Sequence, residues 1–443
     1  MIRKSAITAA LLLAFGAMGT AHATDDGGVD DIFVRGHIDG ELRAYNFDRL
    51  YDSKTTPDAH AFSGAALINA QTGSFWGGFG FGTSFVTANS FGTHSDAVSR
   101  IDTTLAGPNN SIGAFSQLYA QFKNDNILVR GGYQYLDNPW MGKNDSRVIP
   151  SSYNAIMVDV TPLKGWDLYA IRAFSWKSRT STDMFHDNLY YPSTYDGDSS
   201  FGNNGSLPAK APKSNGATAV GTTYLNGGLK AQAWYYNFLG FAKMGYVDGT
   251  YTLKTDSPFN PFLSAQYLHE TSGSDNILVD TKTKLFGVAG DRVRAEVWGA
   301  DIGTSIYDGK IDFSYNKLSS EKGAVGDGAL ISPYTTNYAT DPLYTTSMIR
   351  GLVEEGPGHA WKARALYNFL DKKLQVVAAY AKYTTELRGD SHDVYVDVIY
   401  NLDQWVKGLT VRDRWERSVG GINNLNPSNE AFVYNRVMIT YKF

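Results

Sequence analysis

Short segments in which charged and apolar residues alternate constrain the fold of this chain more than any other feature. In one of them, Ile311 and Phe313 alternate with Lys310, Asp312 and Ser314. Successive side chains of a β-strand point to opposite faces, so this pattern predicts a strand with one apolar and one charged face. A soluble barrel keeps its apolar face inside, because burying unpaired charges costs too much. The charged faces therefore predict a water-filled lumen, and the apolar faces a lipid-facing wall.

Four further segments, at 34–45, 292–297, 361–369 and 393–401, show the same alternation. The residues expected to face outward are Val34, Ile38, Leu42, Ala44, Val293, Ala295, Val297, Trp361, Ala363, Ala365, Tyr367, Phe369, Val394, Val396, Val398 and Tyr400. The residues between them that are expected to face the lumen include Arg35, His37, Asp39, Glu41, Arg43, Arg292, Arg294, Glu296, Lys362, Arg364, Asp393 and Asp397.

The segment 433–443 is the clearest strand, and it ends the chain at Phe443. One face carries Val433, Val437, Ile439, Tyr441 and Phe443, and the other carries Tyr434, Arg436, Met438, Thr440 and Lys442. A terminal Phe preceded by apolar residues at alternate positions resembles the signal that the outer-membrane barrel assembly machinery reads. This strand therefore predicts a barrel of the bacterial outer membrane, with that machinery and the membrane lipids as partners.

The N-terminus has the order of parts found in a secretory signal peptide. Arg3 and Lys4 precede an apolar run at 9–18, which is too short to span a membrane as a helix. Ala-His-Ala at 21–23 is a small-x-small cleavage site, so we expect residues 1–23 to be removed and the mature chain to begin at Thr24. Residues 24–443 are then expected to form one barrel domain in the outer membrane of a Gram-negative bacterium.

Composition excludes several classes of function. The chain has no cysteine, which excludes disulfides, thiol catalysis and lipid attachment through cysteine. It has 40 basic and 44 acidic residues, and an acidic balance is unfavourable for general nucleic-acid binding. Aromatic residues make up 14%, and no apolar stretch after the signal is long enough for a membrane helix. An exported, aromatic-rich chain of this kind is typical of a transmembrane β-barrel.

Turn signals allow the strands to be counted. Short connections rich in Gly, Asn, Asp or Pro are predicted near 72–75, 124–126, 163–165, 226–227, 256–259, 307–309, 370–372 and 406–407. Eight such hairpins with one strand at each end indicate an antiparallel all-β barrel of about 18 strands, and 16 strands remain an alternative. Long connections are predicted at 88–112, 137–152, 177–215, 271–290, 320–358 and 419–431. The short turns are assigned to the periplasmic rim and the long loops to the extracellular rim.

Two parts of the chain resemble the OprD family of outer-membrane porins. The first spans about 128–175 and contains Leu-Val-Arg-Gly-Gly-Tyr-Gln at 128–134, Asn-Pro-Trp at 138–140, Asp-Ser-Arg-Val-Ile-Pro at 145–150 and a hairpin at 155–174 with Gly-Trp-Asp-Leu at its turn. The second spans 405–443 and contains Gly-Leu-Thr-Val-Arg-Asp-Arg at 408–414 and the last strand. Between these parts the similarity is only architectural.

This resemblance implies a monomeric 18-stranded barrel whose loop near 137–152 folds inward to make a constriction. The constriction residues are Asp145, Ser146, Arg147 and Pro150. It also implies a ladder of basic residues that guides carboxylate-bearing substrates, since the guanidinium group stays charged and matches a carboxylate geometrically. The best candidates for the ladder are Arg147, Arg412, Arg414 and Arg436, followed by Arg130, Arg172, Arg364, Arg35 and Arg43.

The alternative for each arginine is an ordinary lumen charge paired with an acid, such as Arg414 with Glu416. Strict alternation also places Asp413 outward, so either a bulge interrupts that strand or its end lies above the lipid. Acidic lumen residues are numerous, and some of them could form a negative wall for the cationic part of a zwitterion.

The predicted function is passive diffusion of small hydrophilic solutes, anionic or zwitterionic, through a partly selective porin. We expect no catalysis, because no Gly-x-Ser-x-Gly or His-Glu-x-x-His motif is present and the histidines are scattered. No metal or cofactor is expected. A TonB-type transporter would need a plug domain, but the alternation begins near residue 33. A general or structural barrel, or an adhesin with little selectivity, remains the alternative.

Overall fold

The computed structural model describes residues 31–53, 55–93, 95–107, 111–192, 205–421 and 431–443. The expected signal peptide at 1–23 and the cleavage site before Thr24 lie outside these residues. Among the described residues, no helix is both long and apolar enough to cross a membrane.

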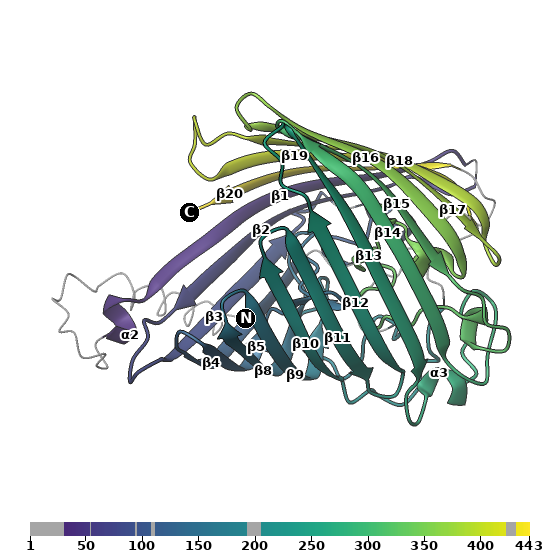
Figure 1. Cartoon of the computed structure of the whole chain (residues 1–443), viewed down its shortest axis with the longest axis horizontal. Helices are drawn as coiled ribbons and strands as arrows, with labels where there is room; N and C mark the ends of the chain where they lie inside the picture. The colour runs from purple at the N-terminus through teal and green to yellow at the C-terminus, as the bar shows by residue number, and fades with distance from the viewer. Residues whose placement is uncertain (1–30, 54, 94, 108–110, 193–204, 422–430) are drawn as a thin grey trace.

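Eighteen antiparallel strands form one closed β-barrel (Figure 1). The wall strands are β1 (His37–Tyr51), β2 (Ala59–Gln71), β3 (Phe79–Asn89), β4 (Ser111–Lys123), β5 (Ile127–Gln134), β8 (Ser152–Leu163), β9 (Trp166–Lys177), β10 (Ala217–Asn226), β11 (Leu229–Phe238), β12 (Ala242–Thr252), β13 (Phe259–Ser272), β14 (Arg294–Ile306), β15 (Gly309–Leu318), β16 (Gly358–Phe369), β17 (Leu374–Thr385), β18 (Gly389–Asn401), β19 (Leu409–Gly420) and β20 (Phe432–Lys442). Each strand pairs with the next, and β20 pairs with β1. The predicted barrel of 18 strands is therefore confirmed, and the alternative of 16 is wrong.

The last strand closes the barrel. Its register against β1 runs from Glu41 opposite Lys442 to Tyr51 opposite Phe432. Beyond these pairs, the backbone amide of Gly40 donates to the carbonyl of Phe443 at 3.0 Å, and the reverse bond is 3.1 Å. Closure leaves no unpaired sheet edge, which is what a strand-built wall in lipid requires.

Most of the predicted faces are correct. Ile311 and Phe313 are exposed on the outside, whereas Asp312 and Ser314 are buried on the inside. The outward residues of the last strand, such as Val437 and Ile439, are exposed as well. An apolar exterior over a polar interior is the pattern of a membrane barrel.

Two predicted strand assignments are wrong. Residues 34–36 do not belong to β1, because the short helix α2 (Asp31–Val34) precedes a strand that begins at His37. At β14 and the residue before it, Val293, Ala295 and Val297 point inward, and the charged residues of that segment point outward. The reason is that the lumen near the loop rim is filled with protein, so the apolar face packs there and the charged face meets solvent.

The two rims differ as predicted, with one exception. All eight predicted short turns join their strands at the rim where β20 ends. At the other rim the six predicted long loops are present, but the connections 52–58, 239–241 and 386–388 are short. The smaller elements are η1 (Val98–Arg100), β6 (Asp137–Asn138), β7 (Met141–Gly142), α3 (Ile277–Asp280), η3 (Val325–Asp327) and α4 (Leu352–Glu355).

Two hydrophobic clusters fill the lumen near the loop rim. The larger one includes Trp140, Trp176 and Tyr334, and it joins the loops to the inner faces of β8 to β17. The smaller one places Ile149 and Met348 against the inner faces of β1 and β20. The loops are therefore packed into the barrel rather than extended from it.

Candidate functional site

The loop 135–151 crosses the lumen from its own strands, β5 and β8, to distant parts of the wall. Its hairpin β6–β7 carries Trp140, which is fully buried edge-on against Tyr246 of β12 at 5.9 Å. Tyr236 of β11 donates to the Asn138 Oδ1 at 2.9 Å. These contacts fix the loop inside the barrel.

The Asp-Ser-Arg motif of this loop is bound to β1 by an ion pair. The Arg43 guanidinium donates to both carboxylate oxygens of Asp145, at 2.6 and 3.0 Å, and to the carbonyls of Arg147 and Val148, both at 3.2 Å. Glu41 holds the other side of Arg43 at 2.6 Å. A bidentate, largely buried pair of this kind fixes geometry well, so Arg43 positions the loop.

Other residues of the motif form further hydrogen bonds. Ser146 accepts from the Arg147 side chain, through its carbonyl at 3.1 Å and its Oγ at 3.2 Å. The carbonyl of Pro150 accepts from the Lys177 ammonium of β9 at 3.2 Å. The motif is thus tied to both β1 and β9.

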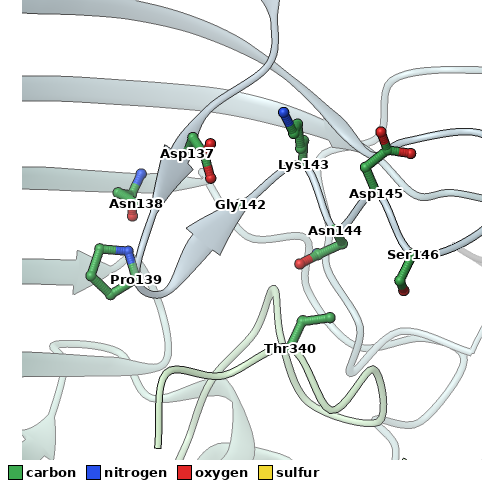
Figure 2. Close-up of a pocket in the computed structure, with 9 residues that line it drawn as sticks. All are labelled: Asp137, Asn138, Pro139, Gly142, Lys143, Asn144, Asp145, Ser146 and Thr340. Carbon is green, nitrogen blue, oxygen red and sulfur yellow. The ribbon is translucent and has the colours of Figure 1, made fainter. Parts of the chain in front are cut away.

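A pocket of about 350 Å³ lies between this loop and a second inward loop, 319–357 (Figure 2). It is lined by Asp137, Asn138, Pro139, Gly142, Lys143, Asn144, Asp145, Ser146 and Thr340. Figure 2 shows Thr340 facing the first loop from the second one. The pocket has charged groups of both signs, as a site for a polar solute would require.

Arg147 of the first inward loop and Arg436 of β20 lie against the same aromatic ring. The Arg147 guanidinium lies 5.2 Å from the ring centre of Phe47, and the Arg436 guanidinium lies 5.4 Å from the same ring and 4.5 Å from that of Tyr434. Arg436 is fully buried and donates only a long bond of 3.5 Å to the carbonyl of Met348. Among the described residues, its Nε and Nη1 have no hydrogen-bond partner.

Arg412 and Arg414 lie above one another on the inner face of β19. Arg412 forms a bidentate pair with Asp397 of β18, and the Arg414 Nε lies 3.2 Å from the same carboxylate. The side chain of Arg412 is 35% exposed, against 16% for Arg414. Asp397 is therefore the ion-pair partner of both arginines, and Glu416, the next inward residue of β19, adds a weaker attraction on Arg414.

The register of β19 against both neighbours runs without interruption, so no bulge changes its parity. Asp413 points outward and accepts from the Asn435 side chain at 2.8 Å. The inward position of Arg412 and Arg414 is therefore established.

Two more predicted ladder residues face the lumen at other places. Arg364 of β16 is paired with Asp312 of β15 at 2.7 Å. Arg130 of β5 donates to Gln121 at 2.9 Å and lies over the Tyr119 ring at 4.2 Å. Both lie on strands away from β19, β20 and β1, where the other predicted ladder arginines gather. The structure therefore shows one group of arginines and two arginines apart from it.

Arg172 and Arg35 do not line the lumen, contrary to prediction. On β9, Ile171 and Ala173 are buried inside, so Arg172 lies on the outer face, where it donates to the carbonyl of Ala173 at 2.6 Å. Arg35 follows α2, before β1 begins, and is exposed. The prediction at Arg172 was wrong because both faces of this strand carry apolar residues, so alternation did not show which face points inward.

The negative wall that the sequence left open has candidates in an acidic sector on β12, β14 and β15, of which only Asp312 was named from the sequence. Asp248 accepts from the Tyr344 hydroxyl at 3.1 Å, and Asp301 accepts from Ser314 at 2.9 Å. Asp312 completes the sector and is shared by Arg364 and, at 3.8 Å, Lys310. Alternation in these strands could have marked the carboxylates as inward-facing. It could not show that they lie close together, because the sequence in the middle of the chain does not reveal how the strands are aligned with one another.

The second inward loop, 319–357, was predicted only as a long external connection. Its Ser347 hydroxyl lies 2.8 Å from an oxygen of Asp393 and 3.0 Å from one of Glu416, and Arg350 contacts Asp393 at 3.5 Å. Arg350 also donates to the carbonyl of Gly420 at 2.8 Å. A buried polar network therefore holds this loop against β18 and β19.

We expect acid to tighten the packing of this loop. Burial raises the pKa of Asp341 to about 6, and burial together with the Asp341 charge raises the pKa of Glu354 well above its usual range. Burial also raises the pKa of Glu355. The packed loop thus binds a proton that a released loop lacks, so its stability increases as the pH falls through about 6 and decreases above it.

The measurement is single-channel conductance between pH 7.5 and pH 5. Between these two pH values protonation stabilises the packed state by about 1–1.5 kcal/mol, so we expect lower conductance at pH 5. The D341N variant should lose most of this dependence, and an unchanged pH profile in that variant would contradict the assignment.

Within the described residues, no group of three or more acidic or histidine side chains could hold a metal ion. No family model matches the chain, and no curated relative matches it either.

The fold is that of known porins. The structure of OccK9 (OpdG) from Pseudomonas aeruginosa matches with a TM-score of 0.75 at 14% identity, over 93% of this chain and 99% of that one. A BenF-like porin from Pseudomonas fluorescens Pf-5 gives 0.73 at 14% identity, over 92% and 98%. Pseudomonas aeruginosa OpdK with vanillate gives 0.67 at 15%, over 92% and 98%. The fold implied by the resemblance to OprD-family porins is thereby confirmed.

Proposed function

We propose that this chain is an outer-membrane porin of the OprD type, through which small hydrophilic solutes diffuse passively. The closed barrel with its apolar exterior and its two inward loops supports this proposal, and so does the similarity of its fold to those porins. A pore narrowed by loops lets a small solute pass while its polar groups contact the wall.

The proposed substrates carry a carboxylate. The observation that carries this proposal is that Arg412 and Arg414, both accessible from the lumen, share the single anion Asp397. Arg436 and Arg147 lie behind these two arginines, so the group has four guanidinium groups against the two carboxylates Asp397 and Glu416 and keeps a net positive charge. A carboxylate can move from one planar guanidinium group to the next when these groups follow one another along the pore.

The acidic sector supports a further refinement of the substrate class. Asp248 and Asp301 could attract a cationic group while the arginines bind the carboxylate, so zwitterions such as amino acids fit as well as organic acids. One of the similar porin structures is that of OpdK with vanillate, which is a carboxylate. This agrees with the proposed class, although the two chains share only 15% identity.

A liposome-swelling panel tests the selectivity. We expect organic acids and amino acids to enter vesicles that contain the protein faster than neutral sugars or simple amines of the same size. The electrostatic preference amounts to about 1 kcal/mol, or roughly fivefold in rate. Equal rates for all solutes in the panel would indicate a general pore and would contradict the proposed selectivity for carboxylates.

The alternative is a structural barrel or an adhesin. Planar-bilayer recordings separate it from a porin, because such a barrel would conduct little under any condition. A channel that opens and conducts in these recordings supports the porin. Permanently closed behaviour at all voltages and pH values would contradict it.

A further inference from the structure

The outer surface of five consecutive strands, β13 to β17, carries one aromatic side chain on each strand near the loop rim. This aromatic row consists of Tyr267, Trp298, Tyr315, Trp361 and Tyr380. Two neighbouring pairs are in ring contact, with centres 5.2 Å apart for Trp298 and Tyr315 and 5.1 Å apart for Trp361 and Tyr380. Outward aromatic rings on neighbouring strands mark the level at which lipid headgroups begin.

Basic residues follow the aromatic row on its loop side. This basic row consists of His269, Arg294, Lys317, His359, Lys382 and His392. On β15 and β17 the lysines come two residues after the tyrosines, and therefore lie on the same outward face. Two histidine rings stack on the aromatic row, His359 on Tyr315 at 6.1 Å and His392 on Tyr380 at 5.8 Å.

The strand register pairs each of these lysines with a histidine. Lys317 lies opposite His359, and Lys382 lies opposite His392. The two lysine–histidine pairs are thus neighbours along the wall, since their strands β15 to β18 are consecutive. Each pair presents an ammonium and a ring nitrogen outward, at the level just above the aromatic row.

The acidic groups near this row include Glu386, which follows β17 and accepts a hydrogen bond from the Ser320 Oγ. Asp390 approaches Lys382 at 3.5 Å, Glu321 approaches Arg294 at 3.9 Å, and Glu296 accepts from the Tyr267 hydroxyl at 3.2 Å. Among the described residues, no carboxylate forms an ion pair with Lys317. The centre of the row therefore has positive charge available for an external anion.

We propose that the basic row binds the phosphorylated headgroup of an outer-leaflet glycolipid. The inference rests on the proposed function, because the loop rim faces the outer leaflet only if the barrel lies in the outer membrane. The aromatic row would pack against the acyl-chain boundary of that lipid, and Lys317 and Lys382 would contact its phosphates. Charge and position fit a headgroup, since the row lies on the outside of the wall, away from the lumen.

Native mass spectrometry of the full chain in detergent tests this proposal, with diphosphorylated lipid A as the probe. We expect lipid A to bind at least tenfold more tightly to the wild type than to the K317Q/K382Q variant, and its dephosphorylated form to bind weakly to both. The matched control is K123Q/K372Q, which removes two lysines from the opposite rim and should bind like the wild type. Equal lipid A binding by wild type and K317Q/K382Q would overturn the proposal, and so would binding of the dephosphorylated form to the wild type as tightly as lipid A itself.

Competition by phosphate and channel conductance provide two further tests. Millimolar inorganic phosphate should compete poorly, because a free ion lacks the acyl chains that pack on the aromatic row; full displacement would indicate a small-anion site and refute the lipid site. Conductance of K317Q/K382Q in planar bilayers should equal that of the wild type. A wild-type protein that binds lipid A but never conducts would contradict the proposed porin and leave the lipid site intact.

Discussion

The R350A variant should conduct several times more current than the wild type. Arg350 is buried, with its Nε 3.5 Å from Asp393 and 3.8 Å from Glu355, and it donates to the carbonyl of Gly420 at 2.8 Å. It thus joins the loop 319–357 to β18 and β19. Removing one partner of a buried ionic network costs about 3–5 kcal/mol, because the remaining carboxylates lose their counter-charge without regaining water.

That cost falls on the packed loop and not on the wall, whose strands keep their backbone hydrogen bonds. A change of about 3 kcal/mol shifts the balance between packed and released loop by about two powers of ten. Single-channel recordings should therefore show a larger conductance level that is rare in the wild type. The released segment also carries Met348, so the same variant should uncover Arg436.

Arg417 provides the matched control for this experiment. It lies on the outer face of β19, half-exposed, and pairs with Asp52 at 2.7 Å. Exposed pairs contribute little, about 0–1 kcal/mol, so R417A should conduct like the wild type. If R350A forms a heat-resistant barrel with wild-type conductance, Arg350 does not hold the loop in a position that limits the current.

The wall was predictable from the sequence because its rules are local. Alternation with a period of two assigns faces, and turn residues at fixed places count strands, so Phe313, Val437 and the closing strand were placed correctly. The prediction failed on β14, where Ala295 and Val297 point inward. There the lumen is filled with protein, and no local pattern reveals what fills it.

The candidate site was predictable only in part. Arg412 and Arg414 followed from parity, and the Asp-Ser-Arg motif followed from a family resemblance. The partners of these residues did not follow, because Asp397, Arg43 and Met348 are brought near them by strand register and loop folding over long distances in sequence. The loop 319–357 is the clearest case, since its anchoring residues look like ordinary loop residues when read alone.

Replacing both Arg412 and Arg414 with alanine should reverse the ion selectivity of the channel. In the wild type these two cations share Asp397, and the variant leaves that carboxylate without either of them, so the charge of this part of the wall falls by two units. A unit charge a few ångströms from a passing ion is worth about 1–3 kcal/mol at the effective dielectric of a wet pore. The ratio of anion to cation permeability should therefore fall by about tenfold or more.

The reversal potential in a salt gradient measures this ratio directly. D397N changes the charge in the other direction, so its reversal potential should move toward stronger anion selectivity. R417A removes an arginine from the outer face of the same strand and should leave the potential unchanged. Opposite shifts in R412A/R414A and D397N, with none in R417A, would place the selective charge on the inner face of β19, because only that side of the strand meets the permeating ion. Identical potentials in all four proteins would mean that solutes pass elsewhere in the lumen, and the arginine pathway would be refuted.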